Sequence, residues 1–365
     1  MTMKLEAHNN FMALALKLAN KGAAGTKPNP KVGALIVKNG EVISTGYHAK
    51  AGEDHAEVIA IKKAGYKAKG ATLYVTLEPC AHQGKTPPCV GLIIKNGIKE
   101  VIVASKDPNP SVNGKGLNEL RANNINIVEG VLESQAEELN KGFFSRMSKG
   151  IPYVRSKIAS SIDGKTSLKN SESKWITSEY ARNDVQQWRK QSCAILTGVG
   201  TINKDNPRLT VRSQSIDNQP YRVILDTHLS INLNSQILEQ KKVILAFSDD
   251  PKKKIDTLRD FDVQLIKLPF NKNFVDLNLL MRELASLEFN DILVESGPSL
   301  NGGLLEQNLI DELILYIAPI IMGGEATPMF HNPILHTMLN KIHLKQKDSR
   351  YFGDDLRLIM DVAKS

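Results

Sequence analysis

The sequence predicts an α/β protein made of two domains, and three observations lead to this prediction. The chain has 365 residues, which is long enough for two domains of ordinary size. Segments with helical periodicity alternate with short runs rich in β-branched residues, as is typical of α/β folds. The alternation restarts after a Gly-Ile-Pro stretch at residues 150–152. We therefore place one domain at residues 1–149 and the other at residues 150–365.

In the first domain, two helix starts can be read from capping signals. Asp54 fits as an N-cap, with Glu57 three residues later as its capping-box partner. Pro87 fits the first position of a helix that contains Cys89. The elements expected, in order, are a helix over 11–18, strands over 34–37 and 41–43 around an Asn-Gly turn, the Glu57 helix, a strand over 72–77, the Cys89 helix and a strand over 101–104.

The second domain is expected to contain a series of buried strands, because short apolar runs recur between helical segments. Cys193 opens one of these runs and is expected to be a buried structural thiol. The segment after Phe330 matches no motif, and we assign it only to packing of this domain. The expected strands lie over residues 154–159, 193–197, 222–225, 243–247, 292–295 and 313–317.

Four residues of the first domain have the chemistry of a hydrolytic zinc site. His55, Cys80 and Cys89 offer one imidazole and two thiols, and Glu57 adds a nearby carboxylate. A catalytic zinc keeps three protein ligands and an open position, where it activates water. A structural zinc site with His82 as the fourth ligand is the alternative. A disulfide between the two cysteines is disfavoured, because nothing in the sequence suggests secretion.

Composition and charge limit the classes of partner. The chain is 41% hydrophobic and 24% charged, as in ordinary soluble proteins, and no apolar run is long enough to span a bilayer. Its first residues lack a signal-peptide pattern, so we expect a cytoplasmic protein. The first 150 residues contain 20 Lys and Arg against 13 Asp and Glu. This excess suits nucleic acid, a phosphorylated small substrate or simply a solvated basic surface.

Ten stretches match family motifs, at residues 28–33, 55–57, 76–80, 84–89, 107–110, 140–143, 159–165, 175–178, 205–212 and 294–298. In this order they resemble the bifunctional deaminase/reductase family of riboflavin biosynthesis. Eight residues separate Cys80 from Cys89, whereas nucleic-acid-editing deaminases have a Cys-x-x-Cys spacing. The longer spacing therefore favours a small-molecule substrate and opposes a nucleic-acid partner.

For the first domain, the resemblance implies a cytidine-deaminase-like α/β/α sandwich that binds Zn²⁺. The metal ligands would be His55, Cys80 and Cys89. Glu57 would carry a proton from the attacking water to the pyrimidine ring nitrogen, a task worth roughly 10²–10⁴-fold in rate. Residues expected to line the substrate pocket, each with a purely structural polar contact as the alternative, are Asn29, His48 and His82.

For the second domain, the resemblance implies a dihydrofolate-reductase-like α/β fold that binds NADPH. Lys157 and Glu295 would handle protons near the reduced carbon, although Lys157 could also be an ordinary strand lysine. Trp175 could equally be a core residue, and the glycine-rich segment a plain turn. The expected cofactor contacts are Ala159, Trp175, Thr201, Asp205, Thr227, Gly297, Pro298, Ser299, Leu300, Asn301, Gly302 and Gly303. The expected substrate contacts are Ser173, Arg189, Leu209, Arg212 and Glu295.

The reaction implied is deamination of 2,5-diamino-6-ribosylamino-4(3H)-pyrimidinone 5′-phosphate, followed by reduction of its ribosyl side chain to a ribityl chain. The resemblance also implies a homo-oligomer, dimeric or larger. We expect no membrane partner, because no apolar run is long enough to span a bilayer. Two alternatives remain open from the residues alone. One is a nucleic-acid deaminase with a C-terminal binding module, and the other is a non-catalytic zinc-stabilised interaction protein.

Overall fold

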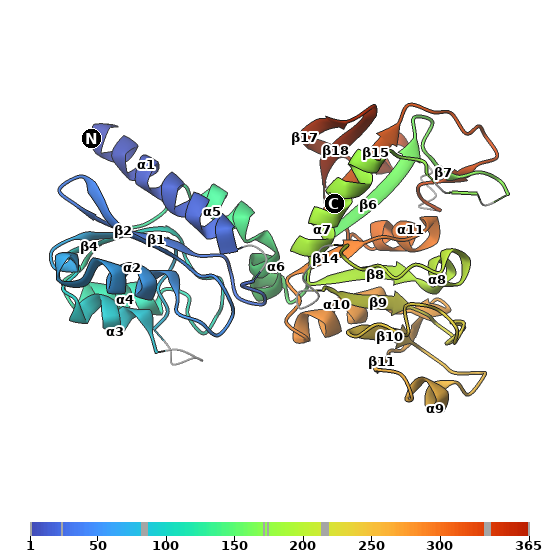
Figure 1. Ribbon diagram of the computed structural model, residues 1–365, viewed down its shortest axis with the longest axis horizontal. Coiled ribbons are helices and arrows are strands. Elements are labelled where there is room, and N and C mark those ends of the chain that lie inside the picture. Colours follow the sequence, from blue (N-terminus) through green and yellow to red (C-terminus); the bar gives the residue numbers. More distant parts are fainter. Residues whose placement is uncertain are drawn as a thin grey trace. The chain divides into compact units, whose positions relative to one another are not determined.

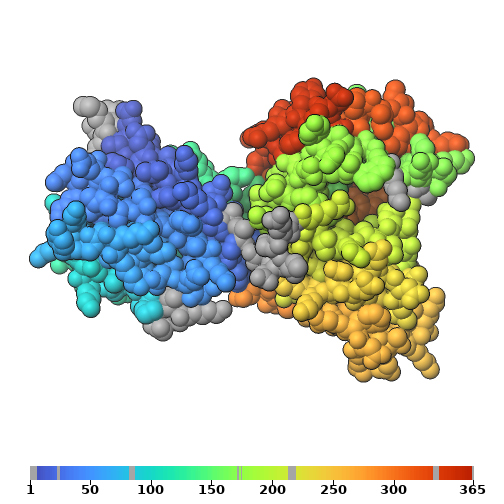
Figure 2. Space-filling model, viewed as in Figure 1, coloured from blue at the N-terminus to red at the C-terminus, as the bar shows by residue number. Residues whose placement is uncertain are grey.

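The chain divides into two compact units, which comprise Met1–Gly150 and Ile151–Ser365. The structure is a computed structural model, and it describes residues 2–22, 25–81, 87–170, 172–173, 175–212, 219–331 and 337–363. The ribbon and space-filling views colour the first unit blue to teal and the second green to red (Figures 1 and 2). Each unit has its own sheet and its own hydrophobic core.

The first unit is built on a five-stranded sheet in the order β2-β1-β3-β4-β5. Strand β1 pairs antiparallel with β2 and β3, whereas β3, β4 and β5 run parallel. Figure 1 shows α2, α3 and α4 on one face of this sheet and α1 and α5 on the other. The elements are α1 Thr2–Ala19, η1 Asn20–Gly22, β1 Gly33–Lys38, β2 Glu41–Tyr47, α2 Ala56–Ala64, η2 Gly65–Ala68, β3 Thr72–Leu77, α3 Cys89–Lys95, β4 Glu100–Ser105, α4 Lys115–Ala122, β5 Asn126–Val128, α5 Glu133–Leu139 and α6 Lys141–Lys149.

The strands and helices expected in this unit are confirmed, but both capping assignments were wrong. Helix α2 has His55 as its N-cap, and no side chain caps it. The Asp54 carboxylate instead forms an exposed ion pair with Lys62 at 2.6 Å. Helix α3 starts at Cys89 with Pro88 as its N-cap, so Pro87 lies outside the helix. Each helix therefore begins at or beside a residue of the predicted zinc motif.

The second unit is built on a nine-stranded sheet in the order β11-β10-β9-β8-β14-β6-β15-β18-β17. Its strands from β11 to β15 are parallel, and β18 and β17 add an antiparallel edge. The elements are β6 Tyr153–Ser161, β7 Lys165–Ser167, α7 Glu179–Gln191, β8 Ala194–Gly198, α8 Val199–Asp205, β9 Tyr221–Leu225, β10 Val243–Phe247, α9 Ile255–Leu258, β11 Val263–Lys267, β12 Phe270–Asn271, β13 Phe274–Val275, α10 Leu277–Ser286, β14 Asp291–Val294, α11 Pro298–Glu306, β15 Glu312–Ala318, β16 Thr327–Pro328, η4 Met338–Asn340, β17 Leu344–Phe352 and β18 Asp355–Val362.

Central strand β14 shows how the second core is divided. Ile292 and Val294 pack in a cluster with side chains of α10 and α11, whereas Leu293 packs in another cluster with side chains of α7. Alternate side chains of a strand point to opposite faces, so helices cover both faces of this sheet. Cys193 is buried, as expected. All six predicted strands of this unit are present within one or two residues of their expected ends.

The C-terminal hairpin was not predicted. Strands β17 and β18 pair with each other, and residues 356–361 of β18 pair with residues 312–317 of β15. The β17 sequence, LKQKDSRYF, is mostly charged or polar and largely exposed. An edge strand that packs little apolar surface carries no clear alternation, which explains why the sequence pattern missed it.

Among the described residues, no helix is both long and apolar enough to cross a bilayer.

Candidate functional site

The three predicted metal ligands lie together in the first unit. His55 is the N-cap of α2, Cys80 follows β3, and Cys89 is the first residue of α3. The His55 Nδ1 atom lies 3.6 Å from the Cys80 Sγ atom and 3.3 Å from the Cys89 Sγ atom. The backbone N–H of Cys89 donates to the Cys80 Sγ atom at 3.4 Å. Two helix starts and one strand end thus converge on a single point.

This donor set fits a zinc ion. With Zn–S of about 2.3 Å, Zn–N of about 2.0 Å and tetrahedral angles, an imidazole nitrogen and a sulfur should lie about 3.5 Å apart. The ligand atoms of the three residues all lie within 4.8 Å of one another. His82, the alternative fourth ligand, lies outside the described residues. In the described chain the group therefore offers three ligands, as a catalytic zinc requires.

The thiols are already polarised toward binding a cation. The hydrogen bond with Cys89, together with that to His55, lowers the pKa of the Cys80 thiol to about 4. The same bond with Cys80, and then burial, raise the pKa of Cys89. The bond to Cys80 also raises the pKa of His55. The lowered pKa of Cys80 favours its thiolate, which is the form that binds a metal, and a bound cation would favour loss of the second proton.

Glu57 lies in the first turn of α2, two residues after His55, and is only 4% exposed. Burial raises the pKa of its carboxyl group above the usual range. A carboxyl group with a raised pKa can accept and return a proton near neutral pH, which a general acid–base catalyst must do. Its position beside the ligand cluster suits that task.

His48 lies next to the metal ligand His55, and Asn29 contacts His48. The Asn29 Nδ2 atom is 3.1 Å from the His48 Nε2 atom, and the His48 Nδ1 atom is 3.2 Å from the Asp54 carbonyl oxygen. The His48 ring meets the His55 ring edge-on at 5.3 Å between centroids. Burial lowers the pKa of His48, which keeps the ring neutral. Both residues therefore border the cluster, and both also have structural contacts.

In the second unit, Lys157, Arg189 and Glu295 form an ionic cluster. Lys157 lies in the middle of β6, Arg189 near the end of α7, and Glu295 directly after β14. The Lys157 Nζ atom is 3.1 Å from the Glu295 Oε2 atom. Arg189 donates to both carboxylate oxygens, from Nε at 2.5 Å and from Nη2 at 3.0 Å. The Arg189 Nη1 atom donates to the Thr210 carbonyl oxygen at 2.9 Å.

The cluster keeps Glu295 ionised. Burial alone would raise the pKa of this carboxyl group, but the charges of Arg189 and Lys157 lower it well below its usual range. Glu295 therefore stays a carboxylate at neutral pH and accepts hydrogen bonds. Lys157 is not a strand lysine facing solvent, because its ammonium group ends at this buried carboxylate. Sequence reasoning named all three residues but gave no sign of their mutual contact.

Most residues predicted to bind the cofactor follow the carboxyl ends of neighbouring parallel strands. Thr201 and Asp205 lie in α8 after β8, and Thr227 follows β9. Gly297 is the N-cap of α11, which begins at Pro298 after β14. Ligands of open α/β sheets bind at this edge, and a helix N-terminus favours phosphate. The remaining predicted contacts of that segment, all in α11, are Ser299, Leu300, Asn301, Gly302 and Gly303.

Other predicted contacts differ in exposure. Asn301 is buried, and its side-chain oxygen accepts hydrogen bonds from Ser156 and Ser296 at 3.0 Å. Trp175 is 70% exposed, with the Arg182 guanidinium 4.2 Å from its ring centre, so the alternative core role of Trp175 is wrong. Of the rest, Ala159 lies on β6 and Ser173 before α7, whereas Leu209 is buried and Arg212 exposed in the segment after α8.

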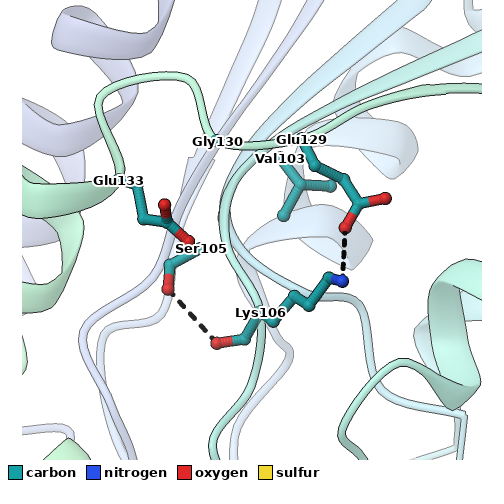
Figure 3. A pocket seen from close by; sticks show the side chains of 6 residues that line it. All are labelled: Val103, Ser105, Lys106, Glu129, Gly130 and Glu133. Carbon is teal, nitrogen blue, oxygen red and sulfur yellow. Dashed lines mark hydrogen bonds and ion pairs between the residues drawn. The ribbon is translucent and has the colours of Figure 1, made fainter.

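A cavity of about 260 Å³ in the first unit lies elsewhere. Its lining is Val103, Ser105, Lys106, Glu129, Gly130 and Glu133. Figure 3 shows the Lys106 ammonium group turned toward Glu129, with which it pairs at 3.1 Å. Arg121 also contacts Glu129. None of the predicted site residues lines this cavity, so it is not the candidate active site.

Comparison with known proteins decides the family. A profile described as "RibD C-terminal domain" matches residues 152–358. A second, described as "Cytidine and deoxycytidylate deaminase zinc-binding region", matches residues 5–105. The riboflavin biosynthesis protein RibD of Escherichia coli is 42% identical over 362 residues, covering 95% of this chain and 97% of the relative. The chain belongs to the RibD family.

Solved RibD structures agree with this membership along the whole chain. Acinetobacter baumannii RibD superimposes with a TM-score of 0.92 at 41% identity, covering 99% of this chain and 100% of that one. A deaminase/reductase from Thermotoga maritima gives a TM-score of 0.87 at 32% identity with the same coverage. The predicted family and fold class are therefore confirmed, with a zinc-binding deaminase region preceding a RibD reductase domain.

Proposed function

We propose that this RibD chain carries out two successive reactions of riboflavin biosynthesis, one in each unit. The unit 1–150 removes an amine from 2,5-diamino-6-ribosylamino-4(3H)-pyrimidinone 5′-phosphate. The unit 151–365 then reduces the ribosyl side chain and gives 5-amino-6-ribitylamino-uracil 5′-phosphate. The observation that carries the proposal is the convergence of His55, Cys80 and Cys89 beside buried Glu57, in a chain that continues into a reductase domain.

For the deamination, the residues divide into a metal-holding set and a proton carrier. His55, Cys80 and Cys89 would hold Zn²⁺, which when bound makes water nucleophilic near neutral pH. Glu57 takes a proton from the attacking water and delivers it to the ring nitrogen. The ring carbon gains the oxygen as a hydroxyl group, Glu57 passes the hydroxyl proton to the amine, and the carbon–nitrogen bond breaks, so that a carbonyl forms and ammonia leaves. Asn29 and His48 border the space in which the ring would lie.

For the reduction, Lys157 is the proton donor, and Glu295 holds its ammonium group in place through an ion pair. NADPH, when bound, supplies a hydride to the sugar carbon that bears the amine. The bond from this carbon to the ring oxygen breaks, and that oxygen needs a proton. The Lys157 ammonium group can give one, whereas Glu295 is held as a carboxylate by Arg189 and Lys157. Arg189 already donates hydrogen bonds to Glu295 and to the Thr210 carbonyl oxygen. Exposed Arg212 is therefore the better partner for the substrate phosphate.

The proposal also includes a cytoplasmic location, as expected from the first residues, and a homo-oligomer, as the family resemblance implies. Exposed apolar side chains that lie close together in the second unit support assembly, since the Ile162 N–H donates to the Ile320 carbonyl oxygen and Ile162, Ile320 and Ile321 are all exposed. Sedimentation of the purified full chain would show a dimer or larger species, and a monomer at micromolar concentration would remove this part of the proposal.

Mass spectrometry of the diaminopyrimidine ribosyl phosphate, incubated with the purified chain, tests the function. Without NADPH we expect exchange of one amine for oxygen, and with NADPH the further gain of two hydrogens. Exchange without reduction would confine the proposal to the first unit. An unchanged substrate in the presence of zinc would remove the substrate assignment altogether.

A further inference from the structure

Glu78, two residues before the metal ligand Cys80, carries an unusual set of hydrogen bonds. It is 4% exposed, and four backbone N–H groups donate to its carboxylate. Oε1 accepts from Gly116 at 3.0 Å and Leu117 at 3.3 Å. Oε2 accepts from Gly114 at 2.9 Å and Asp107 at 3.3 Å. A single buried side chain thus holds the segment 107–117 through hydrogen bonds to its backbone.

The carboxylate substitutes for the N-cap of α4. That helix has Gly114 as its N-cap, and no side chain of its own caps it. Gly116 and Leu117 are the second and third helical residues, whose N–H groups have no partner inside a helix. Glu78 supplies the acceptor from β3, and its negative charge also suits the positive end of the helix dipole.

The backbone of α4 packs tightly against the segment that carries Cys80. A Cβ atom added to Gly116 would lie 2.0 Å from the Pro79 carbonyl oxygen, so only glycine permits this approach. The Glu78 N–H donates to the Ser105 carbonyl oxygen at 3.0 Å, which ties the same segment to β4. The Cys80 carbonyl oxygen accepts from Val90 in α3 at 3.3 Å. The peptide on the N-terminal side of Cys80 is therefore fixed by β4 and α4 together.

Loss of the carboxylate would release one of these restraints. Four N–H groups would lose their acceptor, three of them in the buried residues Asp107, Gly116 and Leu117, and a buried donor without an acceptor is destabilising. The first turn of α4 would move to find water, and the Pro79-Cys80 peptide would no longer be held against it. Because the Cys80 sulfur must stay within bonding distance of a metal shared with His55 and Cys89, a small displacement weakens the site.

We propose that Glu78 is a positioning residue for the metal site: by capping α4 from the end of β3, it fixes Cys80 in the geometry that binds the metal. The inference rests on the proposed zinc-dependent function of the first unit. It assigns to Glu78 neither contact with substrate nor transfer of a proton. Supporting groups of this kind typically change metal affinity by about 10–100-fold.

The test uses the full chain with three substitutions. Glu78→Ala removes the acceptor, and Glu78→Gln keeps its length but places an amide donor against two of the N–H groups. Glu100→Gln is the matched control, since Glu100 begins β4, accepts from Thr72 at 3.2 Å and touches none of the ligands. Zinc retention against a competing chelator, the absorption spectrum with Co²⁺ in place of zinc, and both enzymatic rates are measured on each.

We expect a metal affinity about 10–100-fold lower in Glu78→Ala, a smaller loss in Glu78→Gln and none in Glu100→Gln. The thiolate–cobalt absorption should shift or weaken in the same order, and the reductase rate should stay within twofold of wild type. Wild-type affinity and spectra in both Glu78 variants would overturn the inference. So would loss of the folded first unit in Glu78→Gln, because it would give Glu78 a role in the fold as a whole. A wild-type chain that binds neither metal would instead remove the proposed function.

Discussion

The metal-ligand cluster of the first unit and the ionic cluster of the second contrast in how they balance charge. His55, Cys80 and Cys89 bring together groups whose negative charge increases as the thiols ionise, and their mutual hydrogen bond lowers the pKa of Cys80 and raises that of Cys89. Lys157, Arg189 and Glu295 carry their counter-charges within the protein, where one carboxylate meets two cations. The first site is completed by a metal, and the second is complete as a charge network before any ligand arrives.

Because their charges are balanced in different ways, the two sites should respond differently to loss of a metal and to loss of a charged side chain. A site that needs a cation should lose its activity with the metal and keep its fold, as long as the supporting backbone is intact. A site whose charges are paired within the protein should be insensitive to chelators but should lose stability when the shared carboxylate is removed, because buried charges are then left unpaired. The following predictions test this contrast, from the largest expected effect to the smallest.

Removing zinc should abolish deamination and leave reduction unchanged. Treatment of the full chain with a chelator, or the substitution Cys89→Ala, takes away the group that activates water. Deaminase turnover should fall below detection, and the reductase rate on already deaminated substrate should stay within twofold. Metal content by atomic emission and product mass would check both. If the chelator also lowered the reductase rate, the claim that only the first site depends on a metal would be wrong.

Glu57→Gln should lower the deaminase kcat by roughly 10²–10⁴-fold with zinc still bound, because the proton carrier is lost and the ligands are kept. The control is Glu53→Gln, which changes an exposed carboxylate four residues earlier and should have no effect. Steady-state kinetics and zinc content check the result. Retention of wild-type activity in Glu57→Gln would argue for a non-catalytic zinc protein.

Lys157→Met should lower the reductase kcat by about 10²–10³-fold and leave deamination within twofold, because the proton donor near the reduced carbon is gone. Lys169→Met is the matched control, since Lys169 also pairs with a glutamate, Glu325, but at the surface. Consumption of NADPH followed by absorbance gives the rates. An unchanged rate in Lys157→Met would mean that the proton comes from another group or from water.

Glu295→Gln should destabilise the second unit by about 3 kcal/mol at neutral pH, because it leaves Arg189 and Lys157 buried without their counter-charge. The pKa of Glu295 is lowered on folding, so its stabilising contribution is present above its unfolded pKa near 4.5 and is lost as pH falls below that value.

The difference in the free energy of unfolding between wild type and Glu295→Gln should therefore become smaller at acidic pH. Urea unfolding of the second unit at several pH values measures it, with Glu325→Gln at the surface as the control. If this difference in unfolding free energy stays constant or increases as the pH is lowered, the Glu295 charge is not what stabilises the cluster.

The sequence predicted the first site more fully than the second, for a physical reason. The ligands His55, Cys80 and Cys89 lie close in the chain and have side chains whose chemistry is distinctive. The contact of Arg189 with Glu295 joins positions 106 residues apart, and charged residues of this kind are common. Only the pairing of the parallel strands brings β6, α7 and β14 together, and no local pattern encodes it.

Fold prediction shows the same dependence on local signals. The apolar strand β3 was placed at its observed ends, because its residues are strand formers buried on both faces. The capping box at Asp54 failed, because Glu57 is turned into the buried site and not back toward the helix start. Strand β17 was missed, because its exposed charged residues carry no apolar alternation.

The central claim is that the two chemistries reside in separate sites, one in each unit, and one measurement tests it most directly. Glu57→Gln, supplied with the already deaminated pyrimidine ribosyl phosphate and NADPH, should form the ribityl product at the wild-type rate. The same protein, given the diamino substrate, should not exchange the amine. Loss of the reduction step in Glu57→Gln would contradict the division of labour, because it would tie the second reaction to the catalytic carboxylate of the first.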